Sequence, residues 1–416
     1  MGFEAARLAL KSAPPGTTPD ALWFSTVTPA YVDKTNATTI HAALRLPDSA
    51  GAFDFGGAQR SVMGTVRSAL AGSGTILTVA SDIRIGLPGG PDEAAGGDGA
   101  SGLLIGDGPD VIAEHLASAS TTEEFVDRWR RPGDARSKVW EERFGETRYL
   151  PLGEQAFQAA LKEAELDPDQ VDHLIVTGLH ARAATALSNR LGVEGANVVD
   201  SRAATVGNTG AAHPGLLLTG VLETASPGKV IALVVLADGA DVVLLRTTDA
   251  ISSYRPARSL DDQIAGGAPV TYGKYLAWRK MLPVEPPRRP EPPRVSSSAA
   301  GRAIDWKFGF VGQTDPESGT PQLPPLPSGT EPQPMADVPG TVVTYTVDRL
   351  AYSESPPIIF AVVDFDGGGR LPIELTDVTE SDVAPGVRVE MTFRKLFTSD
   401  DIHNYFWKAR LVRGAA

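Results

Sequence analysis

Residues 4–29 read EAARLALKSAPPGTTPDALWFSTVTP, and residues 154–180 read EQAFQAALKEAELDPDQVDHLIVTGLH. Each stretch predicts an Ala-rich helix, then a turn containing Pro and Asp, then a short apolar strand. The two stretches start about 150 residues apart and agree in the order and spacing of these elements. Self-similarity of this kind predicts a duplicated architecture.

The repeat continues beyond these two stretches. In each copy a second helix and a small-residue turn lead to a third helix, and an apolar strand follows at 75–80 or 230–236. Both copies end in a short apolar run, GASGLLIGDG at 99–108 and GADVVLLRTT at 239–248. Helices that alternate with continuous apolar strands are typical of α/β folds with buried sheets. The expected fold class is therefore a pseudo-symmetric, duplicated α/β structure.

The composition changes after residue 260. Residues 283–298 and 320–340 are rich in Pro, which removes backbone donors and favours extended connectors. Beyond them, short runs alternate apolar and polar residues, with a hairpin expected at Gly367-Gly368-Gly369. Several short strands in so few residues predict a small β-barrel. The expected domains are 1–145 and 146–260 for the two α/β halves, 261–339 for a Pro-rich linker region, and 340–416 for the barrel.

The composition excludes several classes of protein. The 416 residues contain no Cys, which excludes disulfides, Cys-ligated zinc, iron–sulfur clusters and a cysteine nucleophile. The six His do not show HExxH or similar spacing, so no His-built metal site is expected. A net charge of −13 argues against nonspecific binding to nucleic acid. No apolar stretch reaches about 18 residues, so we expect no membrane span and a cytoplasmic location.

The duplicated part resembles the thiolase superfamily, and most closely the hydroxymethylglutaryl-CoA synthases and ketoacyl synthase III enzymes. The segments that carry the resemblance are ALWFSTVTPAYVDKTNATTIHAALRLP (21–47), FDFGGAQRSVMGTVRSAL (53–70), GASGLLIGDG (99–108) and VGNTGAAHPGLLL (206–218). The resemblance implies layered αβαβα halves. Members of this superfamily have a strand, central to the first sheet, before the helix that here begins at Met1. We therefore expect either that Met1 is a downstream start within a longer gene, which we favour, or that the first half lacks this strand.

The C-terminal third resembles the OB-fold proteins that associate with acyl-CoA enzymes. The resemblance is carried by WKFGFVGQ (306–313), the SGTPQLPP run and GTVVTYTVDRL (340–350). Relatives carry a zinc ribbon before the barrel, with paired cysteines. Here Asp315 and Ser318 stand where the first thiols are expected. Tetrahedral thiolate ligation is impossible without Cys, so no zinc is expected.

The resemblance also assigns positions to the reaction site. The family nucleophile, a cysteine at the N-terminus of a helix, corresponds to Gln59. A carboxamide cannot form a thioester, so acyl-enzyme chemistry at this position is excluded. The family histidine corresponds to Thr177, and His180 follows shortly after it. The acid that hydroxymethylglutaryl-CoA synthases place after the first strand is missing from Thr26-Val27-Thr28.

The segment VGNTGAAHP supplies the remaining candidates. Asn208 agrees with the asparagine that helps to hold the thioester carbonyl in ketoacyl synthase III enzymes. Its neighbours Gly207 and Thr209 are candidate substrate-binding residues. His213 stands in a His-Pro pair like that of thiolases, although its register places it in the following helix.

Three functions stay open at this stage. The first is a protein that binds an acyl-CoA or acyl-carrier-protein thioester, acting as a non-catalytic scaffold or as half of a heterodimer whose partner supplies Cys. The second is a lyase of the retro-aldol type or a decarboxylase that works without covalent catalysis. The third is an acyltransferase or hydroxymethylglutaryl-CoA synthase, as the fold suggests. In each case the ligand implied is a coenzyme A thioester, with no cofactor bound covalently, and a homodimer or heterodimer is expected.

Overall fold

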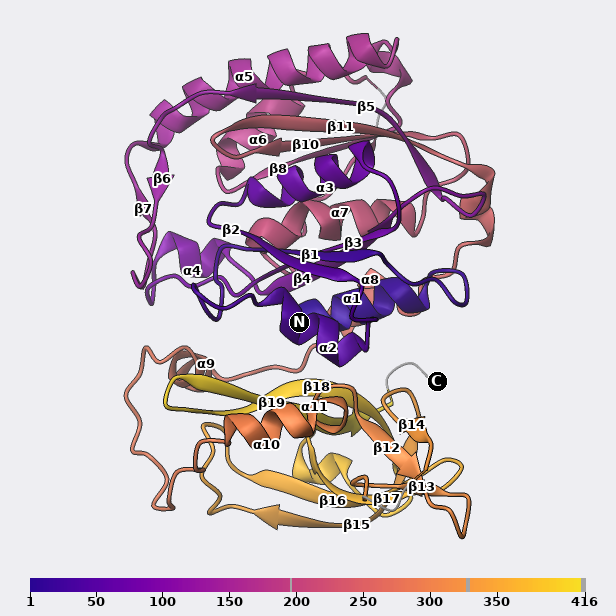
Figure 1. The fold of residues 1–416 in the computed structure, drawn as a ribbon. Coiled ribbons are helices and arrows are strands. Elements are labelled where there is room, and N and C mark those ends of the chain that lie inside the picture. Colours follow the sequence, from indigo (N-terminus) through magenta and orange to yellow (C-terminus); the bar gives the residue numbers. More distant parts are fainter. Residues whose placement is uncertain (195–196, 327–329, 413–416) are drawn as a thin grey trace. The chain divides into compact units, whose positions relative to one another are not determined.

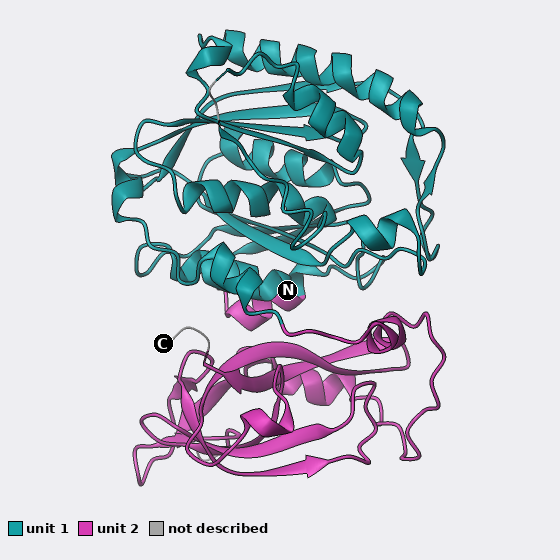
Figure 2. Cartoon of the chain, turned by 180° about the vertical axis from the view of Figure 1, so that it is seen from behind, with its two compact units in different colours: residues 1–38, 47–267 teal, residues 39–46, 268–416 magenta. Residues whose placement is uncertain are grey.

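The computed structural model describes residues 1–194, 197–326 and 330–412. The chain forms two compact units, one made of residues 1–38 and 47–267 and the other of residues 39–46 and 268–416 (Figure 2). The boundary between them falls inside helix α2 (Ala37–Leu44).

The first sheet of unit 1 contains four strands in the order β2 (Gly51–Gly56), β1 (Ala21–Thr26), β3 (Ile76–Asp82) and β4 (Gly99–Ile105). β1 is parallel to β2 and β3, and β4 is antiparallel to β3. Helix α1 (Gly2–Lys11) lies against β3 and β4. The predicted strands at 21–24 and 75–80 are therefore present and adjacent.

The second sheet contains five strands in the order β5 (Ala113–Thr122), β11 (Gly239–Thr247), β10 (Val230–Leu236), β8 (His173–Gly178) and β9 (Asn197–Val198). β10 is parallel to β8 and antiparallel to β11. β5 comes from the segment that the sequence analysis placed in the first half, yet it pairs with β11. It precedes the long helix α5 (Glu142–Glu163) and lies at the edge of its sheet, not at the centre.

Helices form the other layers of unit 1. α3 (Ser61–Ala71) and α7 (His213–Leu222) lie between the two sheets, whereas α5 and α6 (Ala181–Ser188) cover the outer face of the second sheet (Figure 1). The core between the sheets is apolar and includes Val62 and Met63 of α3 and Leu233 of β10. Repeated helix–strand units therefore give the alternating layers that the duplication predicts.

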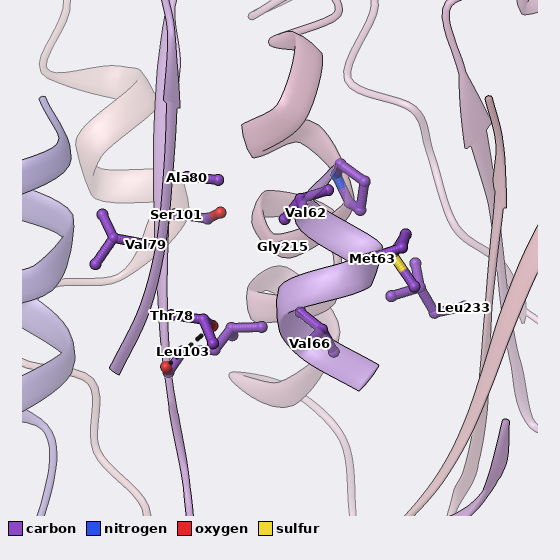
Figure 3. A pocket seen from close by; sticks show the side chains of 11 residues that line it. Val62, Met63, Val66, Thr78, Val79, Ala80, Ser101, Leu103, Gly215 and Leu233 are labelled. Carbon is purple, nitrogen blue, oxygen red and sulfur yellow. Dashed lines mark hydrogen bonds between the residues drawn. The ribbon is translucent and has the colours of Figure 1, made fainter. Parts of the chain in front are cut away.

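The space between α3 and the first sheet is closely packed. Val62 and Val66 lie with Thr78, Ser101 and Leu103 around a cavity of about 10 Å³, and Met63 points towards Leu233 on the other side of the helix (Figure 3). A cavity of that size barely holds one water molecule, so it offers no room for an acyl chain.

The remaining elements of unit 1 are short. They are α4 (Pro91–Ala95), β6 (Arg128–Trp129), β7 (Lys138–Val139), α8 (Leu260–Ala265) and the 3₁₀ helices η1 (Pro168–Gln170), η2 (Gly210–Ala212) and η3 (Asp249–Ser253). β6 and β7 form an antiparallel ribbon between β5 and α5.

Unit 2 contains the expected barrel. The closed barrel has the order β15 (Gly340–Asp348), β16 (Ile358–Phe365), β17 (Arg370–Leu375), β19 (Ile402–Leu411) and β18 (Arg388–Ser399), with η4 (Glu380–Asp382) before β18. Trp407 is buried in it, and its ring centroid lies 5.6 Å from that of the tilted ring of Phe310 and 5.6 Å from that of Phe393 in an edge-to-face arrangement. Helices α9 (Tyr272–Trp278), α10 (Ser297–Arg302) and α11 (Ile304–Lys307) precede the barrel.

A small antiparallel sheet stands where the sequence resemblance implied a zinc ribbon. It pairs β12 (Val311–Thr314) with β13 (Pro321–Gln322) and β14 (Pro332–Pro334). Between β12 and β13, the Asp315 carboxylate accepts hydrogen bonds from the backbone N–H groups of Glu317 and Ser318 and from the Ser318 hydroxyl. No cluster of three metal-ligating side chains occurs in the parts of the chain that the structure describes. The turn is held by hydrogen bonds that the Asp315 carboxylate accepts, and the chain has no Cys to supply thiolate ligands.

Among the helices in residues 1–194, 197–326 and 330–412, none has both the length and the apolar character needed to cross a lipid bilayer.

Candidate functional site

Gln59 lies where the two halves of unit 1 meet. It follows β2, directly precedes Arg60 at the start of α3, and is 5% exposed. Its Nε2 donates a hydrogen bond to the carbonyl oxygen of Gly210 at 3.3 Å, across 151 residues of sequence. Its Oε1 is buried and has no hydrogen-bond partner among the described residues. A buried polar atom without a partner is costly, so this orphan acceptor marks the position as a candidate site.

Asn208 lies on the second-half side of the junction, the region where Gln59 of the first half meets the turn at Gly210. Its Nδ2 donates to the carbonyl of Gly178 at 2.8 Å, and its Oδ1 accepts from the backbone N–H of Gly210 at 2.9 Å. Gly210 has a φ of +63°, a conformation that side chains with a Cβ rarely adopt. Asn208 thereby fixes the end of β8 against the turn that carries the partner of Gln59.

Asp82, which the sequence analysis did not single out, closes the junction from the first half. It ends β3 and is 1% exposed. Its Oδ1 accepts from the Thr26 hydroxyl at 2.8 Å and the Val27 N–H at 2.7 Å, and its Oδ2 accepts from the Ala211 N–H at 2.7 Å. The Thr28 hydroxyl also donates to Oδ1 at 3.3 Å. A carboxylate therefore does contact 26–28, although it comes from the next strand of the sheet.

The sequence contains a feature that could have identified Asp82 as a candidate site residue. An acidic residue ends the apolar run at 76–80, and the carboxyl ends of parallel strands meet at one edge of a sheet. The pairing of β3 with β1 is what brings Asp82 beside Thr26 and Val27. That pairing connects residues more than 50 positions apart, so local sequence does not reveal it.

Thr177 and Gly207 lie in the walls of the same junction. Thr177, at the family histidine position, is 3% exposed in β8 and pairs with Val235 of β10. Gly207 has a φ of +75° and packs so closely on Gly96 that a Cβ would come within 2.9 Å of its backbone. The absence of a side chain at Gly207 therefore allows its backbone to pack directly against the backbone of Gly96.

Thr209 and His213 form a buried pair beside this turn. Thr209 is fully buried, and its N–H donates to Nδ1 of His213 at 3.4 Å. His213 is 2% exposed, and burial lowers its pKa to about 4, although a hydrogen bond to the backbone of Ser201 opposes the shift. The imidazole is consequently neutral near pH 7.

His180 lies outside this group of contacts. Its Nδ1 accepts from the N–H of Ala183, which caps α6, and its Nε2 donates to the carbonyl of Glu142 at 2.7 Å. Both ring nitrogens are thus engaged in holding α6 to the start of α5. The carboxylate of Asp127 lies nearby, and burial raises its pKa, whereas the charge of His180 lowers it.

Arg60 ties the start of α3 to the second sheet. Its guanidinium donates to the Asp241 carboxylate at 2.7 Å and to the carbonyls of Asp238 and Thr121 at 2.8 and 2.9 Å. Asp241 is 4% exposed and also accepts from Arg67 at 3.3 Å. Because Arg60 is adjacent to Gln59, these bonds fix the backbone from which the Gln59 amide projects.

The junction thus brings together Gln59, Asn208, Gly207 and Thr209, with Asp82 added by the structure. Such an arrangement supplies amide donors and a buried amide acceptor, but no thiol. The second hydrogen of the Gln59 Nε2 can be donated to a carbonyl oxygen, and Oε1 can accept from a donor group. The carboxamide cannot capture an acyl group covalently.

Sequence comparison finds hydroxymethylglutaryl-CoA synthases as relatives. The enzyme of Thermococcus gammatolerans is 25% identical over 293 residues, which span 67% of this chain and 83% of the relative. The enzyme of Caldivirga maquilingensis is 28% identical over 214 residues, which span 50% of this chain and 60% of the relative. Residues 332–394 match a protein family described as the C-terminal OB-fold domain of ChsH2.

Solved structures resemble the fold. MvaS in complex with 3-hydroxy-3-methylglutaryl coenzyme A has a TM-score of 0.57 and 20% identity, over 70% of this chain and 81% of that one. An HMG-CoA synthase complexed with CoA has a TM-score of 0.53 and 16% identity, over 79% and 83%. The 3-oxoacyl-(acyl carrier protein) synthase III of Pseudomonas aeruginosa PAO1 has a TM-score of 0.51 and 21% identity, over 59% and 82%.

Proposed function

We propose that this chain, which joins a thiolase-like α/β unit to an OB-fold domain, binds acyl-CoA or acyl-carrier-protein thioesters without capturing the acyl group covalently. The carboxamide of Gln59 holds the thioester at the junction of the two halves, and Asn208 keeps the facing turn in place. The ligand class comes from the relatives, whose solved structures contain CoA or 3-hydroxy-3-methylglutaryl coenzyme A.

One observation carries the proposal. The buried amide of Gln59 reaches the carbonyl of Gly210 in the second half, and its oxygen has no partner in the described part of the chain. The Gln59 Nε2 carries a second hydrogen that can be donated to a thioester carbonyl, and the orphan Oε1 can accept from an N–H group of the ligand, such as an amide of the pantetheine arm. The chain has no Cys, so binding rather than cysteine-based acyl transfer is what these residues support.

The proposal includes a partner. We expect a homodimer, or a heterodimer with a thiolase that supplies the missing cysteine. β2 is an edge strand of the first sheet, and Phe53 on it is 55% exposed. Unpaired edge strands with exposed apolar side chains are suited to pairing with another chain.

The test is to incubate the purified full-length protein with acetyl-CoA and malonyl-CoA. Calorimetry measures the affinity, and mass spectrometry follows the thioesters and the intact protein. We expect saturable binding, unchanged thioesters and no acylated protein. Gln59→Ala should weaken binding about tenfold, the loss of one or two buried hydrogen bonds, whereas Gln158→Ala on the exposed face of α5 should leave it unchanged.

The other outcomes separate the alternatives. Release of carbon dioxide from malonyl-CoA would replace the binding function with a decarboxylase, and cleavage of a carbon–carbon bond in a β-hydroxyacyl-CoA would replace it with a retro-aldol lyase. Turnover to free CoA with transfer of the acyl group would identify an acyltransferase or synthase. A protein that binds neither thioester would contradict the proposal.

A further inference from the structure

Three arginines converge beside the junction. Arg84 lies two residues after Asp82, and Arg128 and Arg130 alternate with Trp129 along β6 and just beyond it. The charges of Arg128 and Arg130 act on Arg84, as do those of Asp82 and Asp92. Three cations and two carboxylates therefore share one partly buried region.

The two carboxylates are already occupied. The carboxylate oxygens of Asp82 accept hydrogen bonds from the Thr26 hydroxyl and from the backbone N–H groups of Val27 and Ala211. Asp92 accepts from both Nη1 and Nη2 of Arg128, a bidentate ion pair. Neither carboxylate forms an ion pair with Arg84.

Arg130 has a clear structural use. Its Nη2 donates to the carbonyl of Val27 at 2.6 Å, while the N–H of Val27 donates to Asp82. Arg130 and Asp82 thus stabilise the same turn by bonding the carbonyl and the N–H of Val27, respectively. Arg84 is the remaining cation of the three.

The side chain of Arg84 runs along the wall of the junction. A Cβ on Gly210 would lie 3.1 Å from its Cδ, and a Cβ on Gly96 would lie 3.1 Å from its Cβ. Gly210 is the residue whose carbonyl accepts the amide of Gln59. The Arg84 guanidinium makes no hydrogen bond or ion pair with any residue in 1–194, 197–326 or 330–412, and burial lowers its pKa.

We infer that Arg84 binds a carboxylate on the acyl group of the thioester, so that the substrate class is dicarboxylic acyl thioesters. The inference rests on the proposed thioester binding at Gln59. The Arg84 guanidinium makes no hydrogen bond to the described residues, and its attraction to Asp82 and Asp92 is opposed by the charges of Arg128 and Arg130, so this half-buried group gains from a further anion, and its planar fork matches a carboxylate. The cost of holding Arg84 there is explained by a ligand that pairs with it.

The position of Arg84 favours the acyl carboxylate over a phosphate of CoA. Its stem contacts Gly210, next to the amide that holds the thioester. The phosphates of CoA are separated from the thioester by the whole pantetheine arm. An anion at Arg84 therefore belongs to the acyl side of a thioester bound at Gln59.

The experiment compares succinyl-CoA with butyryl-CoA, which have equal chain length and differ in the terminal carboxylate. The wild-type protein should bind succinyl-CoA more tightly by roughly tenfold to a hundredfold, the range for charge-assisted hydrogen bonds. Arg84→Met should abolish this preference and leave butyryl-CoA binding within about twofold. Arg84→Lys, which keeps the charge but not the fork, should retain part of it. Arg131→Met, at a 79% exposed side chain in the same segment, is the matched control.

Each other outcome has a distinct meaning. Equal wild-type affinity for both thioesters would overturn the inference and leave the proposed function standing. If neither thioester binds, both proposals fail. If Arg84→Met weakens free CoA as much as succinyl-CoA, while succinyl-pantetheine binding is unaffected, Arg84 binds a phosphate and the assignment to the acyl carboxylate is wrong.

Thermal unfolding gives a second measurement. Because Arg84 makes no ion pair with the described residues, and the attraction of Asp82 and Asp92 is opposed by the repulsion of Arg128 and Arg130, Arg84→Met should leave the unfolding midpoint almost unchanged. A midpoint that falls together with the affinity for both thioesters would identify Arg84 as a structural residue and overturn the inference.

Discussion

The side-chain amide of Gln59 donates to the backbone carbonyl of Gly210 at 3.3 Å, and this bond joins the two repeats of the α/β unit. Gln59 stands at the start of α3, between β2 and the helix. A thiol at the same point would face the positive end of the α3 dipole, which lowers the pKa of cysteine.

Gln59→Cys should therefore gain reactivity. We expect the variant to form an acyl adduct when it is mixed with acetyl-CoA, whereas the wild-type protein forms none. Intact-protein mass spectrometry detects the adduct, and hydroxylamine should remove it if it is a thioester. Ser61→Cys, at the first residue of α3, is the control. Equal labelling of both variants would show that position 59 has no special role.

Asp82 should be important for stability. Asp82→Ala removes the acceptor for two buried backbone N–H groups, those of Val27 and Ala211. Leaving buried donors unsatisfied costs about 1–3 kcal/mol each, so we expect a loss of roughly 2–5 kcal/mol in the free energy of unfolding. Urea denaturation measures it. Asp107→Ala, at an exposed aspartate, should change stability by less than about 0.5 kcal/mol, and a similar loss in both variants would contradict the prediction.

Stability should depend on pH through His213. Burial lowers the pKa of His213 in the folded protein to about 4, below the unfolded value of 6.5. Between these values the unfolded chain binds more protons, so stability is full above pH 6.5 and falls as pH drops towards 4. The effect is on the order of 3 kcal/mol. His213→Gln should lose this slope in denaturation curves measured from pH 7 to 4.5, and an unchanged slope would mean that other groups cause it.

The ribbon sheet of unit 2 should be insensitive to metal removal. The turn after β12 is held by hydrogen bonds to Asp315, and backbone hydrogen bonding to Ser318 lowers the pKa of this carboxyl. Excess chelator should leave the thermal unfolding midpoint unchanged. Asp315→Ala should lower the midpoint of the unit 2 transition, and Asp315→Asn, which keeps one acceptor oxygen, should lower it less. A chelator-induced shift would show that a metal contributes.

Much of the fold was predictable because it follows from local pattern. Strand β10 was predicted at 230–236 and lies at Val230–Leu236, since seven consecutive apolar residues fit only a strand buried on both faces. The duplicated thiolase-like architecture and the OB-fold barrel are confirmed by the structural relatives and the family match. Residues 113–122 were placed with the first half, but they form β5 and pair with β11 in the second sheet. Local sequence does not show which strand a segment pairs with, because that pairing is made only in the folded chain.

The site was only partly predictable. Gln59 and Asn208 both form a hydrogen bond with Gly210, and the roles assigned to them and to Thr209 stay predictions. Asp82 and Arg84 were missed, because neither belongs to a motif that the sequence analysis used. Their importance comes from contacts with Val27 and Gly210, which lie far away along the chain.

By itself, the sequence determined the repeat, the barrel and the absence of any thiol, because periodicity and composition are properties of the chain alone. Only the tertiary structure decided which polar groups share the junction. The packing of α3 between two sheets brings the Gln59 amide to Gly210, and the pairing of β1 with β3 brings the Asp82 carboxylate to the turn at Val27. Hydrogen bonds act over about 3 Å, so such encounters are set by the folded arrangement of the strands and not by their order along the chain.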